Sequence, residues 1–392
     1  MGTLPAYVRE VLNGLQQRGY AAYLVGGCVR DLCMGRVPHD WDIATAARPE
    51  TVQTIFPRTI ATGIRHGTVT VLMSNETVEV TTFRHDGGYK NHRHPTEIAY
   101  MSEVGDDLAR RDFTMNAMAM MQDGTVIDPF GGQADIQRRL IRCVGTAAIR
   151  FEEDALRMLR ALRFSAILGF GIADDTAAAI HTSAHLTAAL SAERVRDELE
   201  KMLLSPRPAL IADGINFGLF SAFFAKQQAN QGRLARLAHL PNNRFYRWAG
   251  FAAILQTDGL IDNPATLMTA LRLERKAIAC VSLAAQLAQS DLPTDVSGIK
   301  HLLAAHGMDV VCLAAEIAVL LKQADIRQTL EVILQSGDCV SLAQLAISGA
   351  DLIALGFAPG KQIGAILEQL LEHVLEYPAD NKRERLLKLA QQ

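Results

Sequence analysis

The sequence predicts an α+β part at the N-terminus followed by an all-helical remainder. Glycines and short β-branched runs concentrate in the first 150 residues, whereas strand signals disappear from about Phe151 onward. In the second part, Ala- and Leu-rich periodicity is interrupted by turn clusters at 205–208, 241–243, 262–264 and 293–298. At roughly 150 residues per domain, a chain of 392 residues is long enough for two to four domains.

The first part alternates strand and helix patterns. Amphipathic patterns predict helices over Tyr7–Arg18 and Pro49–Phe56. Runs of β-branched residues predict strands over 20–25, 67–73 and 77–83.

The composition excludes several classes of protein. Hydrophobic residues make up 49% and charged residues 21%, which excludes a disordered chain. The net charge of −3 provides no global basic field, so a nucleic-acid partner would have to be held by a local patch. No apolar run approaches the ~20 residues that cross a bilayer, and the N-terminus lacks a signal-peptide pattern. The six cysteines form no CxxC pair, so we expect a cytoplasmic protein with reduced thiols and no membrane partner.

A glycine pair links the first strand to a basic helix pattern. In YLVGGCVRD, Gly26 and Gly27 end the strand and open a helix that carries Arg30 and Asp31. Such a junction lets backbone N–H groups approach a phosphate, and the helix N-terminus adds a favourable dipole. Taken alone, a glycine pair more often makes only a turn.

Two aspartates follow about a dozen residues later, in the run DWDIAT. If this run is a strand, its period of two puts Asp40 and Asp42 on one face and Trp41 on the other. One or two carboxylates together with substrate phosphates are the ligands that suit Mg²⁺. Glu79, in the alternating run TVEVT, is a candidate third acid. The alternative, for the pair in isolation, is a solvated strand edge.

Together these motifs resemble a known family. GG-x-VRD followed by DxD is similar to the head of class II tRNA nucleotidyltransferases and bacterial poly(A) polymerases, a branch of the polymerase-β-like superfamily. The resemblance covers nearly the whole chain and implies a nucleotidyltransferase head with a mixed or antiparallel sheet and helices, then an all-α neck, body and tail. The implied domains are the head at 1–150, the neck at 151–205, the body at 206–300 and the tail at 301–392.

The resemblance also implies roles for the residues that match. Asp40 and Asp42 would be catalytic metal ligands for two Mg²⁺ ions, with Glu79 as a third catalytic acid. Gly27 and Arg30 would hold the triphosphate of the nucleotide.

Two further motifs of the family lie downstream. RRDFTMNA is similar to the family motif RRDFT-x-NA, which implies a triphosphate contact by Arg111. Without the resemblance, Arg110, Arg111 and Asp112 could form a surface ion-pair cluster of little energetic value. The turn DPFGG at 128–132 matches a family turn that we interpret as structural.

The segment EDALRMLRALRF predicts a helix with an apolar stripe of Ala155, Leu159, Leu162 and Ala166. Asp154 and Arg157 lie one turn apart on another face, where a wet i,i+3 salt bridge is the alternative interpretation. The resemblance implies that this pair reads the incoming base, and that Arg160 and Arg163 also contact the nucleotide.

Hydrogen-bond chemistry is consistent with that role. Cytosine and adenine each present an amino donor beside a ring-nitrogen acceptor, which a carboxylate and a guanidinium satisfy together. Uracil and guanine present the reverse order, and unpaired polar groups can discriminate by about 10⁴-fold.

The remaining features concern the loop and the RNA. The polar stretch between Arg84 and Glu97 predicts a mobile loop, and the resemblance implies that this 85–95 loop accompanies addition of the terminal A. Its NHRHP departs from the family's D-x-RRP.

ERVRDELEKML at 193–203 is similar to a helix that braces the base-binding helix. Gly349–Gly364 predicts a helix–glycine turn–helix in the tail that would grip tRNA.

The resemblance implies an enzyme that adds CCA to the 3′ end of tRNA. CMP, CMP and AMP would come from CTP and ATP, with release of pyrophosphate. An A-adding enzyme and a poly(A) polymerase use the same parts and stay open as alternatives. A non-catalytic RNA-binding or nucleotide-sensing protein would be favoured by loss of an acid at position 40 or 42, and neither is lost.

Overall fold

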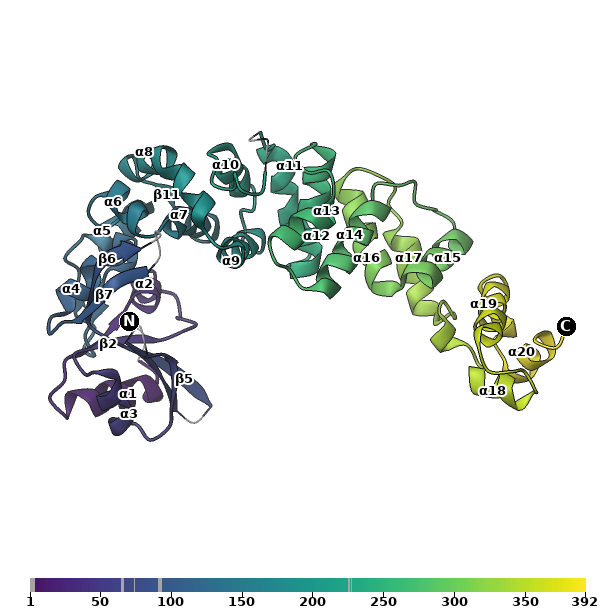
Figure 1. The fold of residues 1–392 in the computed structure, drawn as a ribbon, viewed down its shortest axis with the longest axis horizontal. Coiled ribbons are helices and arrows are strands. Elements are labelled where there is room, and N and C mark those ends of the chain that lie inside the picture. The colour runs from purple at the N-terminus through teal and green to yellow at the C-terminus, as the bar shows by residue number, and fades with distance from the viewer. Residues whose placement is uncertain (1–3, 65–66, 74, 91–93, 225, 227) are drawn as a thin grey trace. The chain divides into compact units, whose positions relative to one another are not determined.

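The computed structural model describes residues 4–64, 67–73, 75–90, 94–224, 226 and 228–392. The chain divides into two compact units, residues 1–202 with 210–227 and residues 203–209 with 228–392. All strands of the described chain belong to the first unit (Figure 1), which confirms the predicted α+β head followed by helices.

The strands are β1 Ala22–Val25, β2 Asp42–Thr45, β3 Thr59–Gly63, β4 Thr68–Met73, β5 Glu76–Thr82, β6 Arg84–Lys90, β7 His94–Tyr100, β8 Ala119–Met120, β9 Val126–Ile127, β10 Leu140–Ile141 and β11 Gly171–Ile172. The helices as far as residue 216 are α1 Ala6–Gln16, α2 Gly27–Cys33, α3 Pro49–Ile55, α4 Val104–Ala109, η2 Thr114–Asn116, α5 Gly132–Arg138, α6 Ala147–Glu153, α7 Leu156–Leu168, α8 Asp174–Ser183, η3 Ala184–Ala189, α9 Ala192–Leu203 and α10 Leu210–Asn216. The later helices are α11 Gln231–Ala235, η4 Arg236–His239, α12 Arg244–Thr257, α13 Pro264–Ala270, α14 Arg275–Leu287, α15 Val296–His306, α16 Met308–Leu320, α17 Arg327–Ser336, η5 Leu342–Gln344, α18 Gly349–Ala354, α19 Lys361–Glu376, η6 Pro378–Asp380 and α20 Arg383–Leu389.

A mixed seven-stranded sheet organises the first unit, with the strand order β3-β4-β5-β2-β1-β8-β9. Strands β2 and β5 are parallel, and the other neighbouring pairs are antiparallel. In this register Asp42 lies opposite Glu79. Residues that are paired across neighbouring strands share a face of the sheet, so the register brings these two acids together where β2 begins.

Helices α1 and α3 pack against one another and against this sheet (Figure 1), as the amphipathic patterns predicted. Their apolar faces bury Val8, Leu12 and Val52 in a core that the strands complete with Val69 and Val80. Continuous burial of this face fixes the sheet on which the acidic residues lie.

The acidic run differs from the prediction in one respect. Strand β2 begins at Asp42, and Asp40 precedes it, exposed, where the chain bends at residues 39–40. Trp41 is 6% exposed and packs into the core of α1 and α3. The strand therefore begins later than predicted and does not include Asp40, while Trp41 is buried away from the acids as expected.

The predicted 85–95 loop is also corrected. Strands β6 and β7 pair antiparallel from Arg84 with Tyr100 to Lys90 with His94, so most of that stretch is a hairpin. The hydrogen bonds between paired strands join backbone N–H and C=O groups. Polar residues and glycines therefore do not prevent strand pairing. Residues 91–93, where the departure from the family motif begins, lie outside the described residues.

The region after Phe151 is not helical throughout. Strand β11 pairs in parallel with β10, which ties the helices α7 and α8 to the end of the head. A strand of two residues is too short to leave an alternating pattern in the sequence.

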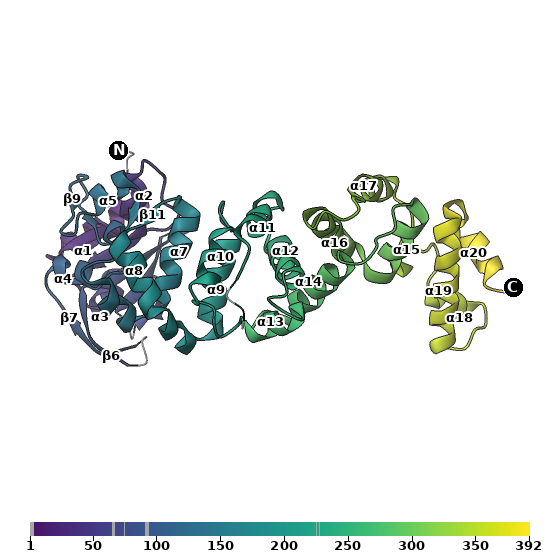
Figure 2. The same ribbon diagram turned by 90° about the horizontal axis from the view of Figure 1, so that it is seen from above.

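Helices alone build the second unit. Helices α12, α14 and α16 lie side by side, as Figure 1 and Figure 2 both show, and bury Trp248, Val281 and Ile317. The predicted helix–glycine turn–helix at Gly349–Gly364 is confirmed as α18 and the start of α19. None of the helices in the described part of the chain has the length and apolar character that crossing a bilayer requires.

Candidate active site

A pocket of about 380 Å³ in the first unit gathers most of the predicted site residues. Its lining includes seven of them, namely Gly27, Arg30, Asp42, Arg111, Asp154, Arg157 and Arg160. The lining is completed by Gly26, Arg110, Asp112, Asn116, Leu156, Phe164 and Arg194. Three predicted residues, Asp40, Glu79 and Arg163, do not line it. A larger hollow of about 690 Å³ beside α1 contains none of the predicted residues.

Asp42 is the acid at the centre of the site. Burial, reinforced by the negative charges of Glu79 and Asp40, raises the pKa of Asp42 to about 6. Arg111 acts in the opposite direction, because its positive charge favours the ionised carboxylate. Burial is the largest of these causes, so the carboxylate of Asp42 is poorly hydrated.

The poorly hydrated carboxylate of Asp42, with Glu79 opposite it, fits a divalent cation. Carboxylate oxygens are the hard ligands that Mg²⁺ prefers, and Mg²⁺ takes its remaining ligands from water and substrate phosphates. Asp42 and Glu79 lie on paired positions of β2 and β5, and Asp40 is close enough to influence the pKa of Asp42. The part of the chain that the structure describes contains no cluster of three such side chains close enough to form a complete metal cage. The donors thus suit a cation that the substrate helps to bind.

Gly26 allows a close approach within the pocket. Its φ of 75° lies in the left-handed region, and a Cβ there would lie 2.9 Å from Nη1 of Arg111. The same Cβ would lie 3.8 Å from Oδ2 of Asp42. A side chain at position 26 would therefore displace Arg111.

Arg30 and Arg160 are connected through two polar side chains. Arg30 donates to Oδ1 of Asn116 at 2.9 Å, and Asn116 donates to Oδ1 of Asp112 at 3.2 Å. Arg160 donates to Oδ2 of Asp112 at 2.7 Å. Burial opposes ionisation of Asp112, but Arg160 and Asn116 prevail and lower the pKa of Asp112 to about 2. This chain of bonds holds arginines from α2 and α7 in fixed positions.

Arg111 is anchored on one side only. Its Nη2 donates to Asp107 at 2.9 Å, and Asp107 is fully buried. Its Nε is buried and has no hydrogen-bond partner within the protein. A buried donor without a partner costs free energy, so this atom is suited to an anionic ligand.

Asp154 lies between two helices rather than within one. It follows α6 in an extended conformation, with φ −146° and ψ 103°. Its Oδ1 accepts from the N–H of Leu156 at 3.1 Å, and its Oδ2 accepts from Nη2 of Arg194 at 2.8 Å. An ionised carboxylate can accept about four hydrogen bonds, so acceptor sites remain for a ligand. The expectation that Asp154 and Arg157 lie on a continuous helix was wrong.

The backbone N–H of Arg157 donates to the carbonyl oxygen of Asp154 at 3.0 Å, but its buried side chain bonds to other groups. It donates to the carboxylate of Glu153 at 2.6 Å and to the carbonyl oxygens of Arg150 and Arg110. The sequence analysis weighed a wet salt bridge between Asp154 and Arg157, whereas the ion pair of Arg157 is with Glu153 and is only 10% exposed at the arginine. Both predicted residues nevertheless line the pocket that holds Asp42.

Arg163 lies on α7 outside the pocket lining, where it pairs with Glu198 of α9. On α9 the side chains of Val195, Leu199 and Met202 are buried, and ion pairs join Glu198 to Arg163 and Arg194 to Asp154. Arg194 reaches the pocket, and Nη1 of Arg194 is buried without a partner within the protein.

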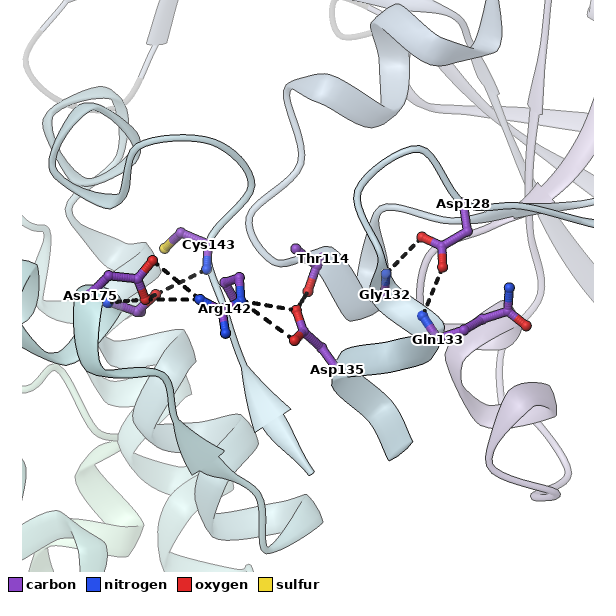
Figure 3. A network of polar contacts seen from close by, with 9 residues as sticks. Thr114, Asp128, Gly132, Gln133, Asp135, Arg142, Cys143 and Asp175 are labelled. Atoms are coloured by element: carbon purple, nitrogen blue, oxygen red, sulfur yellow. Dashed lines mark hydrogen bonds and ion pairs between the residues drawn. The ribbon is translucent and has the colours of Figure 1, made fainter. Parts of the chain in front are cut away.

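A second polar network, shown in Figure 3, connects Thr114 of the RRDFTMNA motif with residues outside the pocket lining. Thr114 donates to Asp135 at 2.7 Å, and Arg142 contacts both Asp135 and Asp175. In the DPFGG turn, Asp128 accepts from the N–H groups of Gly132 and Gln133. A Cβ at position 132 would lie 2.3 Å from the carbonyl oxygen of Thr114, so only glycine fits there.

Sequence reasoning missed several residues of the site. Asn116, Glu153 and Arg194 all lie within motifs whose outlines were visible. Their partners come from residues 4 to 86 positions away, so spacing alone could not assign them.

Three protein families match consecutive parts of the chain. Residues 22–142 match the Poly A polymerase head domain. Residues 169–230 match the family described as a probable RNA and SrmB-binding site of polymerase A. Residues 243–390 match the putative domain 2 of tRNA nucleotidyltransferase. Together with the acidic residues and arginines of the pocket, these matches define a nucleotidyltransferase.

Individual relatives specify the family further. The CCA-adding enzyme of Limosilactobacillus fermentum is 38% identical, over 99% of this chain and 98% of that protein. The CCA-adding enzyme of Geobacillus kaustophilus is 37% identical, over 96% and 94%. The crystal structure of the Bacillus stearothermophilus CCA-adding enzyme in complex with CTP is 33% identical and superposes with a TM-score of 0.81, covering 99% of this chain and 98% of that one. The chain belongs to the CCA-adding enzyme family.

Proposed function

We propose that this protein adds the 3′-terminal CCA to tRNA without a nucleic-acid template. CMP, CMP and AMP are transferred from CTP and ATP, and pyrophosphate is released. The observation that carries the proposal is end-to-end similarity to CCA-adding enzymes, combined with a single pocket that contains Asp42, Asp154 and the arginines. The reaction would take place in the cytoplasm, in keeping with six free cysteines.

The residues of the pocket and the acids beside it would have different roles. Asp40 and Asp42, with Glu79, would hold two Mg²⁺ ions. When bound, these ions supply Lewis-acid activation of the RNA 3′-hydroxyl and neutralise charge on the leaving pyrophosphate. Gly27, Arg30 and the half-anchored Arg111 would bind the triphosphate.

Other residues of the pocket would select the base. Asp154 would accept a hydrogen bond from the amino group of cytosine or adenine, and Arg157 would donate to the adjacent ring nitrogen. Arg194 keeps the carboxylate of Asp154 in place. Arg160, held by Asp112, adds positive charge beside the nucleotide. Arg163 lies one turn further along α7 and would act on the nucleotide through that helix rather than by contact.

The domain assignment follows the same logic. The head at 1–150 would carry the chemistry, and the neck at 151–205 would carry base recognition. The body at 206–300 and the tail at 301–392 would hold the tRNA. In the tail, Lys361 begins α19 directly after Gly360, where a backbone phosphate could be bound.

Incorporation of single nucleotides tests the proposal. The protein is incubated with tRNA lacking one, two or three terminal nucleotides and with labelled CTP, ATP or UTP. We expect two C and one A on the shortest substrate, then no further growth, and no incorporation of UTP. Use of ATP alone on tRNA that ends in CC would instead identify an A-adding enzyme. Long runs of A on any RNA would identify a poly(A) polymerase.

A further inference from the structure

Three guanidinium groups surround the ring of Phe164 on α7. The Cζ atoms of Arg163, Arg30 and Arg160 lie 4.1, 5.4 and 5.5 Å from the ring centroid. A cation within about 6 Å of the face of an aromatic ring is attracted by the electron density of that face. Arg30 comes from α2, whereas the other two arginines come from α7. One side chain therefore contacts cations from two helices that are far apart in the sequence.

Each of the three arginines also has a carboxylate partner, but no two share the same one. Arg30 pairs with Asp31, Arg160 pairs with Asp112, and Arg163 pairs with Glu198. Hydrogen bonds through Asn116 and Asp112 link Arg30 to Arg160, whereas Arg163 pairs with Glu198 outside that chain of bonds. Among these contacts, the ring of Phe164 is the group that all three arginines have in common.

The ring itself is held firmly by the protein. Phe164 is 6% exposed, and its ring meets the ring of Phe113 edge-on, with centroids 5.8 Å apart and an interplanar angle of 86°. Phe113 is fully buried, directly before η2. The position of the ring is therefore set before any ligand binds, and Phe164 also lines the pocket with Arg30 and Arg160.

We propose that Phe164 is a positioning residue, whose ring holds Arg163 close to Arg30 and Arg160, the two arginines that line the pocket, so that a triphosphate meets a preformed cluster of positive charge. Guanidinium groups so close together repel one another, and a ring among them offsets part of that repulsion. Without it the hydrogen bonds through Asn116 and Asp112 would have to hold Arg30 and Arg160 against this repulsion alone, so the cluster would be less well ordered before the nucleotide binds, which weakens binding. The identity of the ligand rests on the proposed function, but the role of the ring does not.

Stepwise fluorination of the ring separates this role from simple packing. Fluorine withdraws electron density from the face of the ring and changes its size little, so folding is retained. Phenylalanine carrying one, two or three fluorine atoms is introduced at position 164 of the full chain. Calorimetry then measures the dissociation constants of CTP, ATP and inorganic triphosphate.

We expect each added fluorine to weaken binding of all three ligands, by about tenfold over the series. The melting temperature and kcat should change little, whereas KM should rise with the dissociation constants. Inorganic triphosphate has no base, so its response isolates the arginine cluster from base recognition.

Phe170 provides a matched control within the same unit. It is 4% exposed, and Cζ of Arg139 lies 5.9 Å from the centroid of its ring, but it does not line the pocket. Fluorination at position 170 should leave all three dissociation constants unchanged. Equal responses at positions 164 and 170, or no response at 164, would overturn the proposal.

A conventional substitution adds a second test. Phe164→Leu keeps an apolar side chain but removes the ring, and we expect a raised KM for CTP and for ATP with kcat within a fewfold. Wild-type KM values in a folded Leu variant would show that packing alone matters and would overturn the proposal. Failure of the wild-type protein to add CCA would instead refute the proposed function, while the triphosphate titration would still decide the role of Phe164.

Discussion

Arg194 of α9 donates a hydrogen bond to the carboxylate of Asp154 at 2.8 Å, across 40 positions of sequence. The contact fixes an acidic side chain of the pocket at the junction between α6 and α7, in the segment that we propose selects the base. The backbone of Asp154 is extended, so helical geometry does not fix the direction of its side chain. Its orientation therefore depends on Arg194 and on the N–H of Leu156.

Replacement of Asp154 should change which bases the enzyme accepts. Asp154→Ala removes the acceptor for the amino group of cytosine and adenine, so we expect use of CTP and ATP to fall together or UTP and GTP to be admitted. Asp154→Asn offers a donor as well as an acceptor, and should favour UTP more than the Ala variant does. The measurement is kcat/KM for each of the four nucleoside triphosphates. Unchanged selectivity in both variants would remove Asp154 from base recognition.

Replacement of Arg194 should act differently. Arg194→Ala leaves the carboxylate of Asp154 chemically intact but frees its orientation. We expect KM to rise for CTP and for ATP by about tenfold, since a charge-assisted hydrogen bond contributes about 1.5–3 kcal/mol. UTP should remain excluded. Admission of UTP by this variant, measured in the same assay, would mean that Arg194 itself reads the base.

Asp42 is expected to be essential for catalysis but not for RNA binding. Asp42→Ala should reduce nucleotide transfer by at least about a thousandfold, because metal ions contribute several kcal/mol to transition-state stabilisation. The affinity for tRNA, measured by filter binding, should stay within a fewfold of the wild-type value. Asp123→Ala, an exposed aspartate of the same unit, is the control and should retain activity. Substantial turnover by the Asp42 variant would argue against metal binding there.

Much of the fold could be predicted from the sequence because its elements carry clear periodic patterns. Helices α1 and α3 and strands β1, β4 and β5 lie within about two residues of the predicted ranges. Strands β10 and β11 could not be predicted, since two residues show no period. The hairpin of β6 and β7 was missed because strand pairing uses backbone hydrogen bonds. Polar residues and glycines form these bonds as well as apolar residues do, so the composition did not reveal the strands.

The sequence predicted which residues form the candidate site, but not which side chains pair with one another. The motifs indicated the residues that the pocket gathers, including Asp42, Arg111 and Asp154. The assumption of a continuous helix placed Arg157 beside Asp154, whereas the break at Asp154 leaves Arg157 paired with Glu153. A helix break inside a motif changes every i,i+3 and i,i+4 neighbour, and the sequence contains no proline or glycine there to signal it.

The hairpin allows a sharper test of A addition than removal of a loop. Lys90 pairs with His94, and Tyr89 pairs with Pro95, so residues 90–94 can be replaced by Asn-Gly with the remaining register kept. We expect addition of A to tRNA ending in CC to fall more than addition of C to tRNA lacking all three nucleotides. Equal loss at both steps would contradict a specific role in A addition. A variant that replaces only residues 91–93 by glycines is the control for length.

The buried pair of Asp112 and Arg160 predicts how stability depends on acid. The pKa of Asp112 is about 2 in the folded protein, below the value of about 3.8 for an unfolded chain. The contribution of Asp112 to the free energy of unfolding is therefore fully present above about pH 4. The contribution, about 2 kcal/mol, is lost as the pH falls from about 4 to about 2. We therefore expect the melting transition of the first unit to decline with acid more steeply in the wild-type protein than in Asp112→Asn. Asparagine does not titrate, so the stability of the variant does not depend on protonation at position 112. The variant should nevertheless melt several degrees lower at neutral pH, because Arg160 is left without its carboxylate. Calorimetric scans between about pH 2 and about pH 7 measure both effects, and parallel curves for the two proteins would show that another carboxylate controls the acid transition.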